Sequence, residues 1–226
     1  MSNGLQHIGF IADGNRRWAK AQGLPTLEGH RRGSDKVEMI LDKLKDSPVK
    51  FVSLFVFSTD NWGRPQEEID YLMDMAAKGI KRFSQKAMKN NLRIIILGRP
   101  EKVNPKLWQD IQDFVSETKD NTGLTACFCF NYGGRWEIAD AAKKAAEAHE
   151  TDYSPENFRK YLYHPEVPDV DLVVRTSGEQ RSSGFMLWRA ALAEFCFIDK
   201  YFPEITAEDI DQIISEYEQR ERRFGK

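Results

Sequence analysis

The segment DGNRRW at 13–18 combines an acid, a glycine, an amide and two arginines directly after a short apolar run. A carboxylate can ligate Mg2+, and the backbone N–H groups of a tight turn can hold phosphate oxygens. Guanidinium groups add fixed charge in a geometry that suits phosphate. The segment therefore predicts a metal–diphosphate site centred on Asp13, although Asp-Gly turns also occur without any function.

The elements that position this segment follow from the apolar pattern. The run at 8–12 is typical of a buried strand, and it ends at turn residues. Polar residues also follow the predicted strand ends at 58–61, at Asn131 and at Arg175. Because the carboxyl ends of parallel strands meet at one edge of a sheet, we expect these residues to gather there with Asp13.

Strand-like and helix-like segments alternate along the chain, which predicts an α/β fold with a central, mostly parallel six-stranded sheet flanked by helices. We expect a single domain over residues 1–226. The predicted strands are 8–12, 50–57, 92–97, 124–130, 171–174 and 195–198. One predicted helix ends near Leu44, and the others cover 66–89, 105–118, 136–148 and the segment after Thr206.

The predicted helix 66–89 carries an apolar stripe at helical spacing. Two interpretations of the stripe remain open, namely ordinary core packing and one wall of a long apolar tunnel beside the sheet. Its members are Ile69, Leu72, Met73, Ala76, Ile80, Phe83 and Ala87.

Arginines and hydroxyls are concentrated near the predicted strand ends, which favours a ligand with two or more phosphate groups. Each arginine taken singly is also compatible with ordinary surface charge. The candidate set from this reasoning is Asp13, Asn15, Arg16, Arg17, Trp18, His30, Ser58, Asn61, Trp62, Arg64, Arg175, Arg181, Ser182 and Ser183.

Composition and missing motifs exclude several classes. The formal net charge of −2 gives no overall field that would attract nucleic acid. The sequence has no P-loop, no dinucleotide fingerprint, no G-x-S-x-G and no H-E-x-x-H. Cys127, Cys129 and Cys196 are expected to be buried thiols, without disulfides or zinc. No signal peptide or membrane-spanning run is apparent, so we expect a cytoplasmic protein with no more than peripheral membrane association.

Several blocks, in order along nearly the whole chain, resemble the cis-prenyltransferases, the undecaprenyl diphosphate synthase family. They are HIGFIADGNRRWAK at 7–20, EGH at 28–30, FSTDNWGRP at 57–65, NYGGR at 131–135, DLVVRTSGEQR at 171–181, FMLW at 185–188, AEF at 193–195 and RERRFG at 220–225.

This resemblance implies a Mg2+-dependent condensation of isopentenyl diphosphate with an allylic diphosphate to give a Z-polyprenyl diphosphate. It also implies a homodimer, with the 220–225 tail reaching across the subunits. The apolar product is expected to leave into a membrane, and no nucleic-acid partner is expected.

The resemblance assigns roles to individual residues. Asp13 would ligate Mg2+, together with Glu194 of the partner subunit. The block at 58–64 would act at the reacting centre, with Asn61 handling the proton through a phosphate oxygen or water because an amide is a poor base. The allylic diphosphate would be held by Gly14, Asn15, Arg16, Arg17, Trp18 and His30. The residues at the reacting centre would be Ser58, Thr59, Asp60, Asn61, Trp62 and Arg64. Isopentenyl diphosphate would be held by Arg175, Arg181, Ser182 and Ser183.

Some positions depart from the family pattern. Thr26 replaces a frequent arginine, and Arg16 is expected to compensate for that charge. Ala12 stands where methionine is frequent, and Val56 where alanine is. Two large side chains, Phe128 and Phe130, precede Asn131 and share one face of the strand. They predict a plugged cavity and a product shorter than the C55 usual for bacterial members, unless they pack against a helix.

Other classes are distinguishable from the sequence. An ordinary long-chain synthase remains an alternative within the family. A non-catalytic partner subunit should lack Asp13 or the 175–181 block, and both are present. A trans-type prenyltransferase would carry D-D-x-x-D, which is absent.

Overall fold

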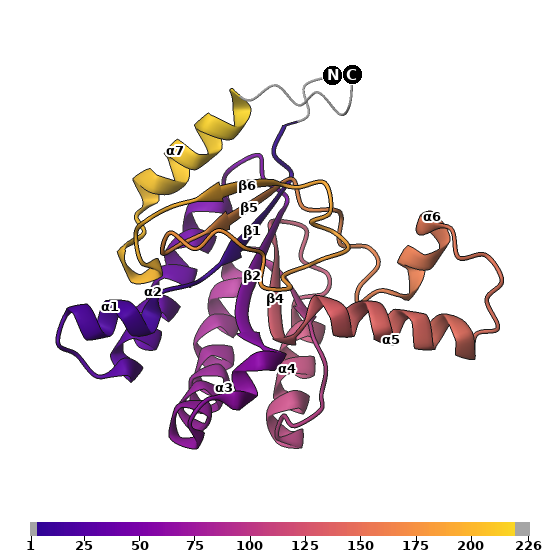
Figure 1. The fold of residues 1–226 in the computed structure, drawn as a ribbon, viewed down its shortest axis with the longest axis horizontal. Coiled ribbons are helices and arrows are strands. Elements are labelled where there is room, and N and C mark those ends of the chain that lie inside the picture. The colour runs from indigo at the N-terminus through magenta and orange to yellow at the C-terminus, as the bar shows by residue number, and fades with distance from the viewer. Residues whose placement is uncertain (1–3, 220–226) are drawn as a thin grey trace.

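The computed structural model describes residues 4–219, so the predicted cross-subunit tail at 220–225 lies outside the described residues. Within this range the chain forms one six-stranded sheet in the order β3-β4-β2-β1-β5-β6, with every neighbouring pair parallel (Figure 1). The predicted fold class is confirmed.

The strands match the predicted runs to within a few residues. They are β1 (His7–Ile11), β2 (Phe51–Ser58), β3 (Arg93–Leu97), β4 (Thr125–Tyr132), β5 (Leu172–Arg175) and β6 (Glu194–Phe197). The helices are α1 (Asn15–Ala21), α2 (Thr26–Leu44), α3 (Gln66–Lys89), α4 (Pro105–Glu117), α5 (Gly134–Glu147), α6 (Pro155–Phe158) and α7 (Ala207–Glu218), with short 3-10 turns η1 (Thr59–Gly63), η2 (Arg159–Tyr161) and η3 (Phe202–Glu204).

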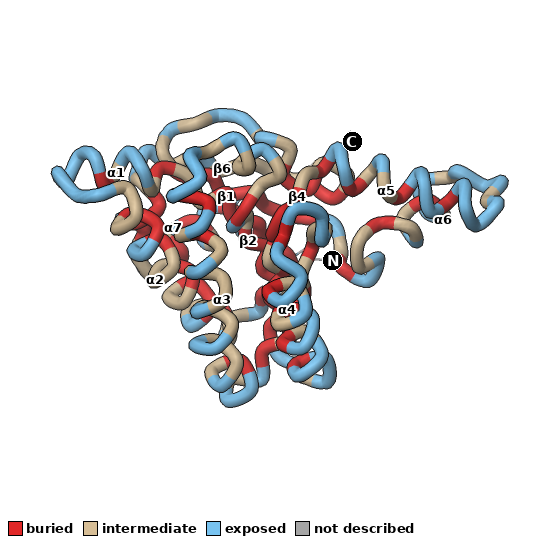
Figure 2. The backbone as a smooth tube through the Cα atoms, turned by 90° about the horizontal axis from the view of Figure 1, so that it is seen from below, coloured by how far each residue is buried: buried red, intermediate tan, exposed pale blue. Residues whose placement is uncertain are grey.

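Two apolar layers hold the sheet. On one face, buried residues of α2, α4 and α7 pack against β1, β2 and β4. On the other face, the segments 163–170 and 185–190, which flank β5 in the chain, cover β3, β4 and β5. Figure 2 shows that the buried positions concentrate in the strands while the outer turns of the helices are exposed. The sheet is covered on both faces, which explains why its strands read as nearly continuous apolar runs.

Three strand ends differ from the prediction. Asn131 does not follow β4 but lies inside it: the register shifts after Phe55 and again after Phe57, so Asn131, with φ 49°, is passed over and Tyr132 pairs with Ser58. Ser58 and Arg175 are likewise the last residues of β2 and β5 rather than the residues after them. The prediction also missed α1, since its short cationic sequence lacks an apolar stripe.

An ion pair between Glu137 of α5 and Arg189 is completely buried, with both side chains 0% exposed. The carboxylate of Glu137 also accepts a hydrogen bond from the Tyr132 hydroxyl, and the guanidinium of Arg189 donates to the Tyr163 carbonyl at 2.6 Å. This network joins the end of β4 to the covering segments 163–170 and 185–190. A buried ion pair is costly to form, so its value depends on every hydrogen bond being made.

Removing one partner of this pair should therefore destabilise the protein strongly. We expect Glu137→Leu and Arg189→Met each to lower the free energy of unfolding by about 3–5 kcal/mol, because each leaves the other charge buried and unpaired. Urea unfolding followed by circular dichroism measures the loss. The double variant removes both charges and should recover most of it, so a double variant as unstable as the sum of the singles would contradict the account.

Candidate diphosphate site and apolar cavity

The side chain of Asp13 is fixed at the carboxyl edge of the sheet by two arginines. Its Oδ2 accepts a hydrogen bond from Nη2 of Arg175 at 2.8 Å, and its Oδ1 accepts one from Nη2 of Arg17 at 3.2 Å. The backbone N–H of Gly14 donates to the same Oδ1 at 2.7 Å. Arg175 is 3% exposed, so its charge depends on Asp13 as a counter-ion. The carboxyl ends of β1 and β5 therefore lie next to each other, as the sequence predicts.

The backbone around Asp13 is held just as firmly. The Asp13 N–H donates to Oγ1 of Thr176 at 2.9 Å, and the Thr176 hydroxyl donates to the Asp13 carbonyl at 2.7 Å. Gly14 has φ 96°, and a Cβ there would lie 2.0 Å from Oγ of Ser177. Only glycine fits this turn, which aims the first turn of α1 across the edge of the sheet.

Burial of Asp13 by itself would raise the pKa of its carboxyl. The hydrogen bond and charge of Arg175, the Gly14 N–H and the charge of Arg17 outweigh this effect, so the pKa of Asp13 lies below its ordinary value of 3.8. The carboxylate is therefore ionised at neutral pH, as a metal ligand must be.

A cleft of about 750 Å³ opens beside Asp13, and we call it the arginine cleft. It brings together most of the residues predicted to hold an allylic diphosphate, and it adds Lys20 as a further cation. Trp18 lies on α1 but is not part of the lining. The lining residues are Ala12, Asp13, Gly14, Asn15, Arg16, Arg17, Lys20, Leu24, Pro25, Thr26, His30 and Arg64.

Glu68 of α3 organises the cations of this cleft, and the sequence analysis missed it. Its Oε1 lies 3.0 Å from Nε2 of His30 and 3.0 Å from Nη1 of Arg64, and its Oε2 lies 3.9 Å from Nε of Arg16. Glu68 is 6% exposed. Burial is the main cause that lowers the pKa of His30, with Glu68 acting in the opposite direction. One local signal could have indicated this ion pair: Glu68 stands four residues after Arg64, at the spacing of side chains that meet along a helix, and on the apolar side of α3.

The predicted reacting-centre block forms a compact cap. Ser58 and Asn61 make a capping box at η1, in which Oδ1 of Asn61 accepts from the Ser58 N–H at 3.0 Å. Nε1 of Trp62 donates to Oδ1 of Asn131 at 2.8 Å, which fixes the indole ring. Thr59 and the exposed Asp60 belong to η1 itself. The amide of Asn61 is thus oriented by the backbone at the end of β2.

The segment after β5 returns to Arg175. Nη1 of Arg175 donates to Oγ of Ser183 at 2.8 Å and to the carbonyl of Arg181. The side chains of Arg17 and Arg181 both pair with Glu179, a second acid that the sequence analysis missed. Arg181 and Ser183 are exposed and Ser182 is half-buried. The two predicted diphosphate-binding groups therefore adjoin each other, because Arg17 and Arg181 share Glu179 while Arg17 and Arg175 share Asp13.

Glu194 does not join this site within the chain. It is the first residue of β6 and lies opposite Leu172, the first residue of β5, whereas Asp13 follows the last residue of β1. The two carboxylates therefore lie at opposite edges of the sheet. Among residues 4–219, no cluster of three or more His, Cys, Asp or Glu side chains is arranged to hold a metal ion.

An apolar cavity of about 180 Å³ adjoins the arginine cleft, and Ala12, Asn15 and His30 line both. It lies between the sheet and helices α2, α3 and α4. The side chains of Val56, Phe128 and Phe130 line it, as do Met75, Ala76, Gly79, Ile80 and Phe83 of the α3 stripe. Phe128 also packs against Phe83, with ring centroids 6.4 Å apart.

Within the described part of the chain, three buried polar atoms in the residues around Asp13 have no hydrogen-bond partner. They are Oδ1 of Asn15, Nε of Arg175 and Oγ of Ser177. Such atoms are rare in folded proteins, and they concentrate where a ligand or ordered water completes the network. Among the described helices none is long and apolar enough to cross a membrane.

The chain is thus an α/β protein of the parallel-sheet class, with an acid–arginine pair at the carboxyl edge of the sheet beside a cationic cleft and an apolar cavity. The family model described as putative undecaprenyl diphosphate synthase matches residues 11–225. The chain belongs to this family of cis-prenyl diphosphate synthases, the isoprenyl transferases.

Individual relatives agree with this assignment. The isoprenyl transferase of Thermotoga maritima is 42% identical over 97% of this chain and 96% of its own. The ditrans,polycis-undecaprenyl-diphosphate synthase ((2E,6E)-farnesyl-diphosphate specific) of Micrococcus luteus is 37% identical over 97% of this chain and 91% of its own. The crystal structure of lavandulyl diphosphate synthase from Lavandula x intermedia, in complex with dimethylallyl diphosphate, has a TM-score of 0.93 at 27% identity and covers 98% of both chains.

The lowered pKa of Asp13 predicts how stability depends on pH. A carboxyl whose pKa is lower in the folded state stabilises the fold above its unfolded pKa, and it loses this contribution as the pH falls through the folded value. At neutral pH, Asp13→Asn should cost about 2 kcal/mol, since it removes hydrogen bonds to a charged group.

The difference in free energy of unfolding between the wild type and Asp13→Asn should then shrink as the pH falls from about 4 through the lowered pKa of Asp13. Urea titrations at several pH values measure this difference. A difference that stays constant from neutral pH to below pH 3.8 would show that the ionised form of Asp13 is not stabilised by Arg175.

Proposed function

We propose that this protein is a Mg2+-dependent cis-prenyltransferase that condenses isopentenyl diphosphate with an allylic diphosphate. The observation that carries the proposal is the position of the Asp13–Arg175 pair, at the junction between a cationic cleft and an apolar cavity. An allylic diphosphate has a charged end and an apolar end, and each has a matching surface here. The relatives named above support the same reaction.

In this proposal the allylic diphosphate lies in the arginine cleft, held by Arg16, Arg17 and Arg64, with its prenyl tail in the cavity. The isopentenyl diphosphate lies against Arg175, Arg181 and Ser183. The allylic C–O bond breaks and diphosphate leaves, the isopentenyl double bond forms the new C–C bond, and a proton is lost. Guanidinium groups preorganised around the leaving group stabilise the charge that develops on it.

The donor set fits a single Mg2+. This ion is commonly held by one or two carboxylates together with substrate phosphates and water. Asp13 is such a carboxylate, ionised and half-buried beside the arginine cleft. When bound, Mg2+ would neutralise charge on the leaving diphosphate. Glu194 lies too far along the sheet to help within one chain, so we assign it to the site of a partner subunit in a homodimer.

Asn61 is proposed to orient the departing proton rather than to accept it. Its Oδ1 already receives the Ser58 N–H, and an amide oxygen is a weak base. A phosphate oxygen or a water molecule is the acceptor in this account. We further propose that the chain acts as one domain and releases its apolar product at a membrane surface.

The direct test of this function is turnover. The protein is incubated with Mg2+, labelled isopentenyl diphosphate and, in turn, dimethylallyl, geranyl or farnesyl diphosphate, and the products are sized. We expect Z-polyprenyl diphosphates with at least one primer and none after chelation of the metal. Failure with every primer would favour the alternative, a non-catalytic partner subunit.

Asp13→Ala should lower turnover by about 10³-fold, because it removes the metal ligand and the counter-ion of Arg175. Circular dichroism checks that the variant is folded. Asp110→Ala is the matched control, since Asp110 pairs with Lys106 on α4. An Asp13→Ala enzyme with the wild-type rate would place the reaction elsewhere.

Product length depends on the cavity in this proposal. Val56, Phe128 and Phe130 line it and restrict its volume, so we propose a product shorter than C55. Val56→Ala and Phe130→Ala should each lengthen the product. Phe158→Ala, which removes a buried ring against Trp188, is the control for loss of stability alone. Unchanged products in both cavity variants would refute the plug.

A further inference from the structure

The cavity is small compared with the chain that the proposed reaction would build. An engineered cavity of about 150 Å³ holds a single benzene molecule. The cavity here, at about 180 Å³, therefore has room for little more than one five-carbon unit. A longer tail extends beyond this volume, so the contacts at the sides of the cavity decide where the tail can pass.

Most walls of the cavity resist movement. The strands β2 and β4 are paired from Phe51 to Ser58, with register shifts only after Phe55 and after Phe57. Helix α3 packs on α4 through buried apolar side chains, among them Leu72, Leu107 and Ile111. Close packing of this kind is costly to open.

The side between α2 and α3 is different. The residues that line the cavity there include Gly33 and Ser34 of α2 and Gly79 of α3, and a Cβ on Gly79 would meet only the edge of Phe83, at 4.0 Å. These small residues leave a gap between the two helices, whereas other residues of both helices, among them Leu41 of α2 and Ala87 of α3, belong to one buried apolar cluster. A second kind of contact holds the helices together beside the gap.

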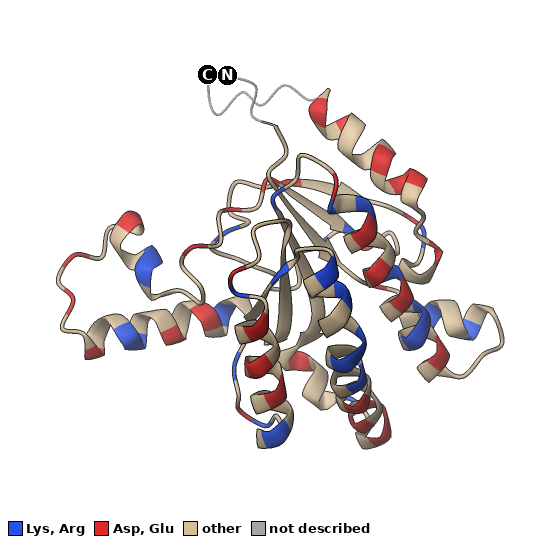
Figure 3. Ribbon diagram, turned by 180° about the vertical axis from the view of Figure 1, so that it is seen from behind, with Lys and Arg blue, Asp and Glu red and all other residues tan. Residues whose placement is uncertain are grey.

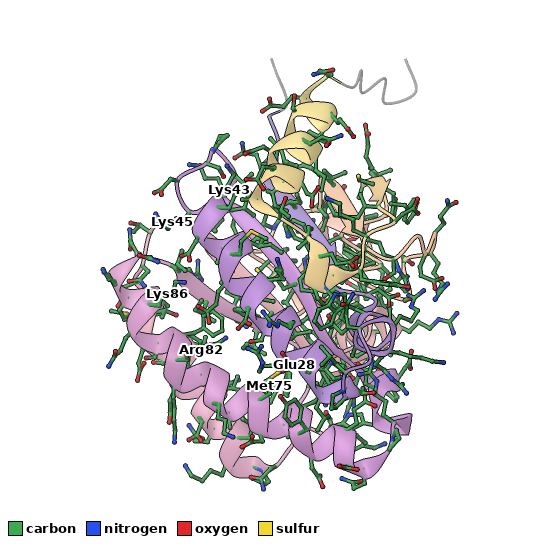
Figure 4. All side chains as sticks on the ribbon, turned by 90° about the vertical axis from the view of Figure 1, so that its left-hand side faces the viewer. Glu28, Lys43, Lys45, Met75, Arg82 and Lys86 are labelled. Carbon is green, nitrogen blue, oxygen red and sulfur yellow. The ribbon has the colours of Figure 1, made fainter. Side chains whose placement is uncertain are left out.

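Ion pairs supply it. Nη2 of Arg82 donates to Oγ of Ser34 at 2.9 Å and pairs with Glu38 at 2.5 Å. Nζ of Lys86 pairs with Asp42 at 2.6 Å and with Glu38 at 3.3 Å. Figure 4 looks onto this side of the molecule, with Arg82 and Lys86 between the ribbons of α2 and α3. We call these contacts the α2–α3 strap.

The charges of α3 suit this arrangement. Its first half carries Glu67, Glu68, Asp70 and Asp74, whereas its second half carries only cations, a separation visible along the helix in Figure 3. The cations of the strap are partly exposed, at 48% for Arg82 and 31% for Lys86. Exposed ion pairs are weak and are screened by salt, so the strap is easily opened.

We propose that the α2–α3 strap is a specificity determinant of the prenyl transfer: while closed, it limits the length of the growing chain, and when opened, it lets the tail emerge between α2 and α3. This inference rests on the proposed function, because it takes the occupant to be the tail of the growing prenyl diphosphate. Arg82 and Lys86 act by holding α3 against α2, so they are positioning residues and do not touch the reacting atoms.

The first test compares product lengths. Arg82→Gln/Lys86→Gln should lengthen the main product by at least one five-carbon unit, and about 0.5 M NaCl should do the same to the wild type. Lys78→Gln is the matched control, because it removes a cation of α3 that pairs within the helix, with Asp74. The proposal is overturned if the double variant and the control make products of equal length.

Coupling between the two helices sharpens this test. Glu38→Gln alone should also lengthen the product, since Glu38 accepts from both cations. Added to Arg82→Gln/Lys86→Gln it should have no further effect, because its partners are already gone. Independent, additive effects would show that the charges act separately and not as a strap.

A second measurement does not depend on turnover. Met75 of α3 lines the cavity about two helical turns before Arg82 (Figure 4), and Met75→Cys places a thiol there. Its alkylation by N-phenylmaleimide should be several-fold faster when combined with Arg82→Gln/Lys86→Gln, and faster at high salt with the strap intact. The parent protein, with its three native cysteines, gives the background rate.

The two measurements separate this inference from the proposed function. If the wild type makes no prenyl product, the proposed function fails, and the strap is then judged by the alkylation rate alone. A rate that is the same with and without the strap overturns the inference in either case.

Discussion

The guanidinium of Arg175 lies almost fully buried at the end of β5, and its ion pair with Asp13 is the contact around which the site is built. A buried charge without a counter-ion would be very costly, so the ends of β1 and β5 cannot separate without a large penalty. The same contact keeps Asp13 ionised and orients it toward the arginine cleft. The other terminal nitrogen of Arg175, Nη1, donates to the Ser183 hydroxyl and the Arg181 carbonyl, and so holds the segment that follows β5. One guanidinium therefore contacts both Asp13 and this segment.

The second constraint is the boundary between polar and apolar surfaces. Asn15 and His30 lie where the arginine cleft meets the cavity, and α1 and α2 must approach closely to bring them together. Gly29 permits this approach, since a Cβ there would lie 2.1 Å from the Asn15 carbonyl. An amphiphilic ligand is held best where its charged end meets fixed cations and its apolar end meets a dry surface. The cations are concentrated by Glu68, which keeps Arg64 and Arg16 near His30 without neutralising them all.

Much of this arrangement was predictable from local patterns. Asp13, Ser58 and Arg175 were placed at one edge of the sheet because apolar runs of strand length end beside them, and parallel strands present their carboxyl ends together. Asn131 was misplaced because the two register shifts between β2 and β4 depend on the pairing of distant segments and leave no local signal. Glu68 and Glu179 were missed for a related reason: an acid on a helix or loop resembles surface charge until its partners are known.

The sequence by itself determined the order of strands and helices, the family and the identity of the residues at the carboxyl edge, because periodicity and motifs are local properties of the chain. Only the tertiary structure decided which charges pair, how large the cavity is and which of its walls is held by ion pairs. It also decided that Glu194 lies at the edge of the sheet opposite Asp13. These features depend on distances between segments that are far apart in the chain, and such distances are fixed only when the sheet and its covering helices pack together.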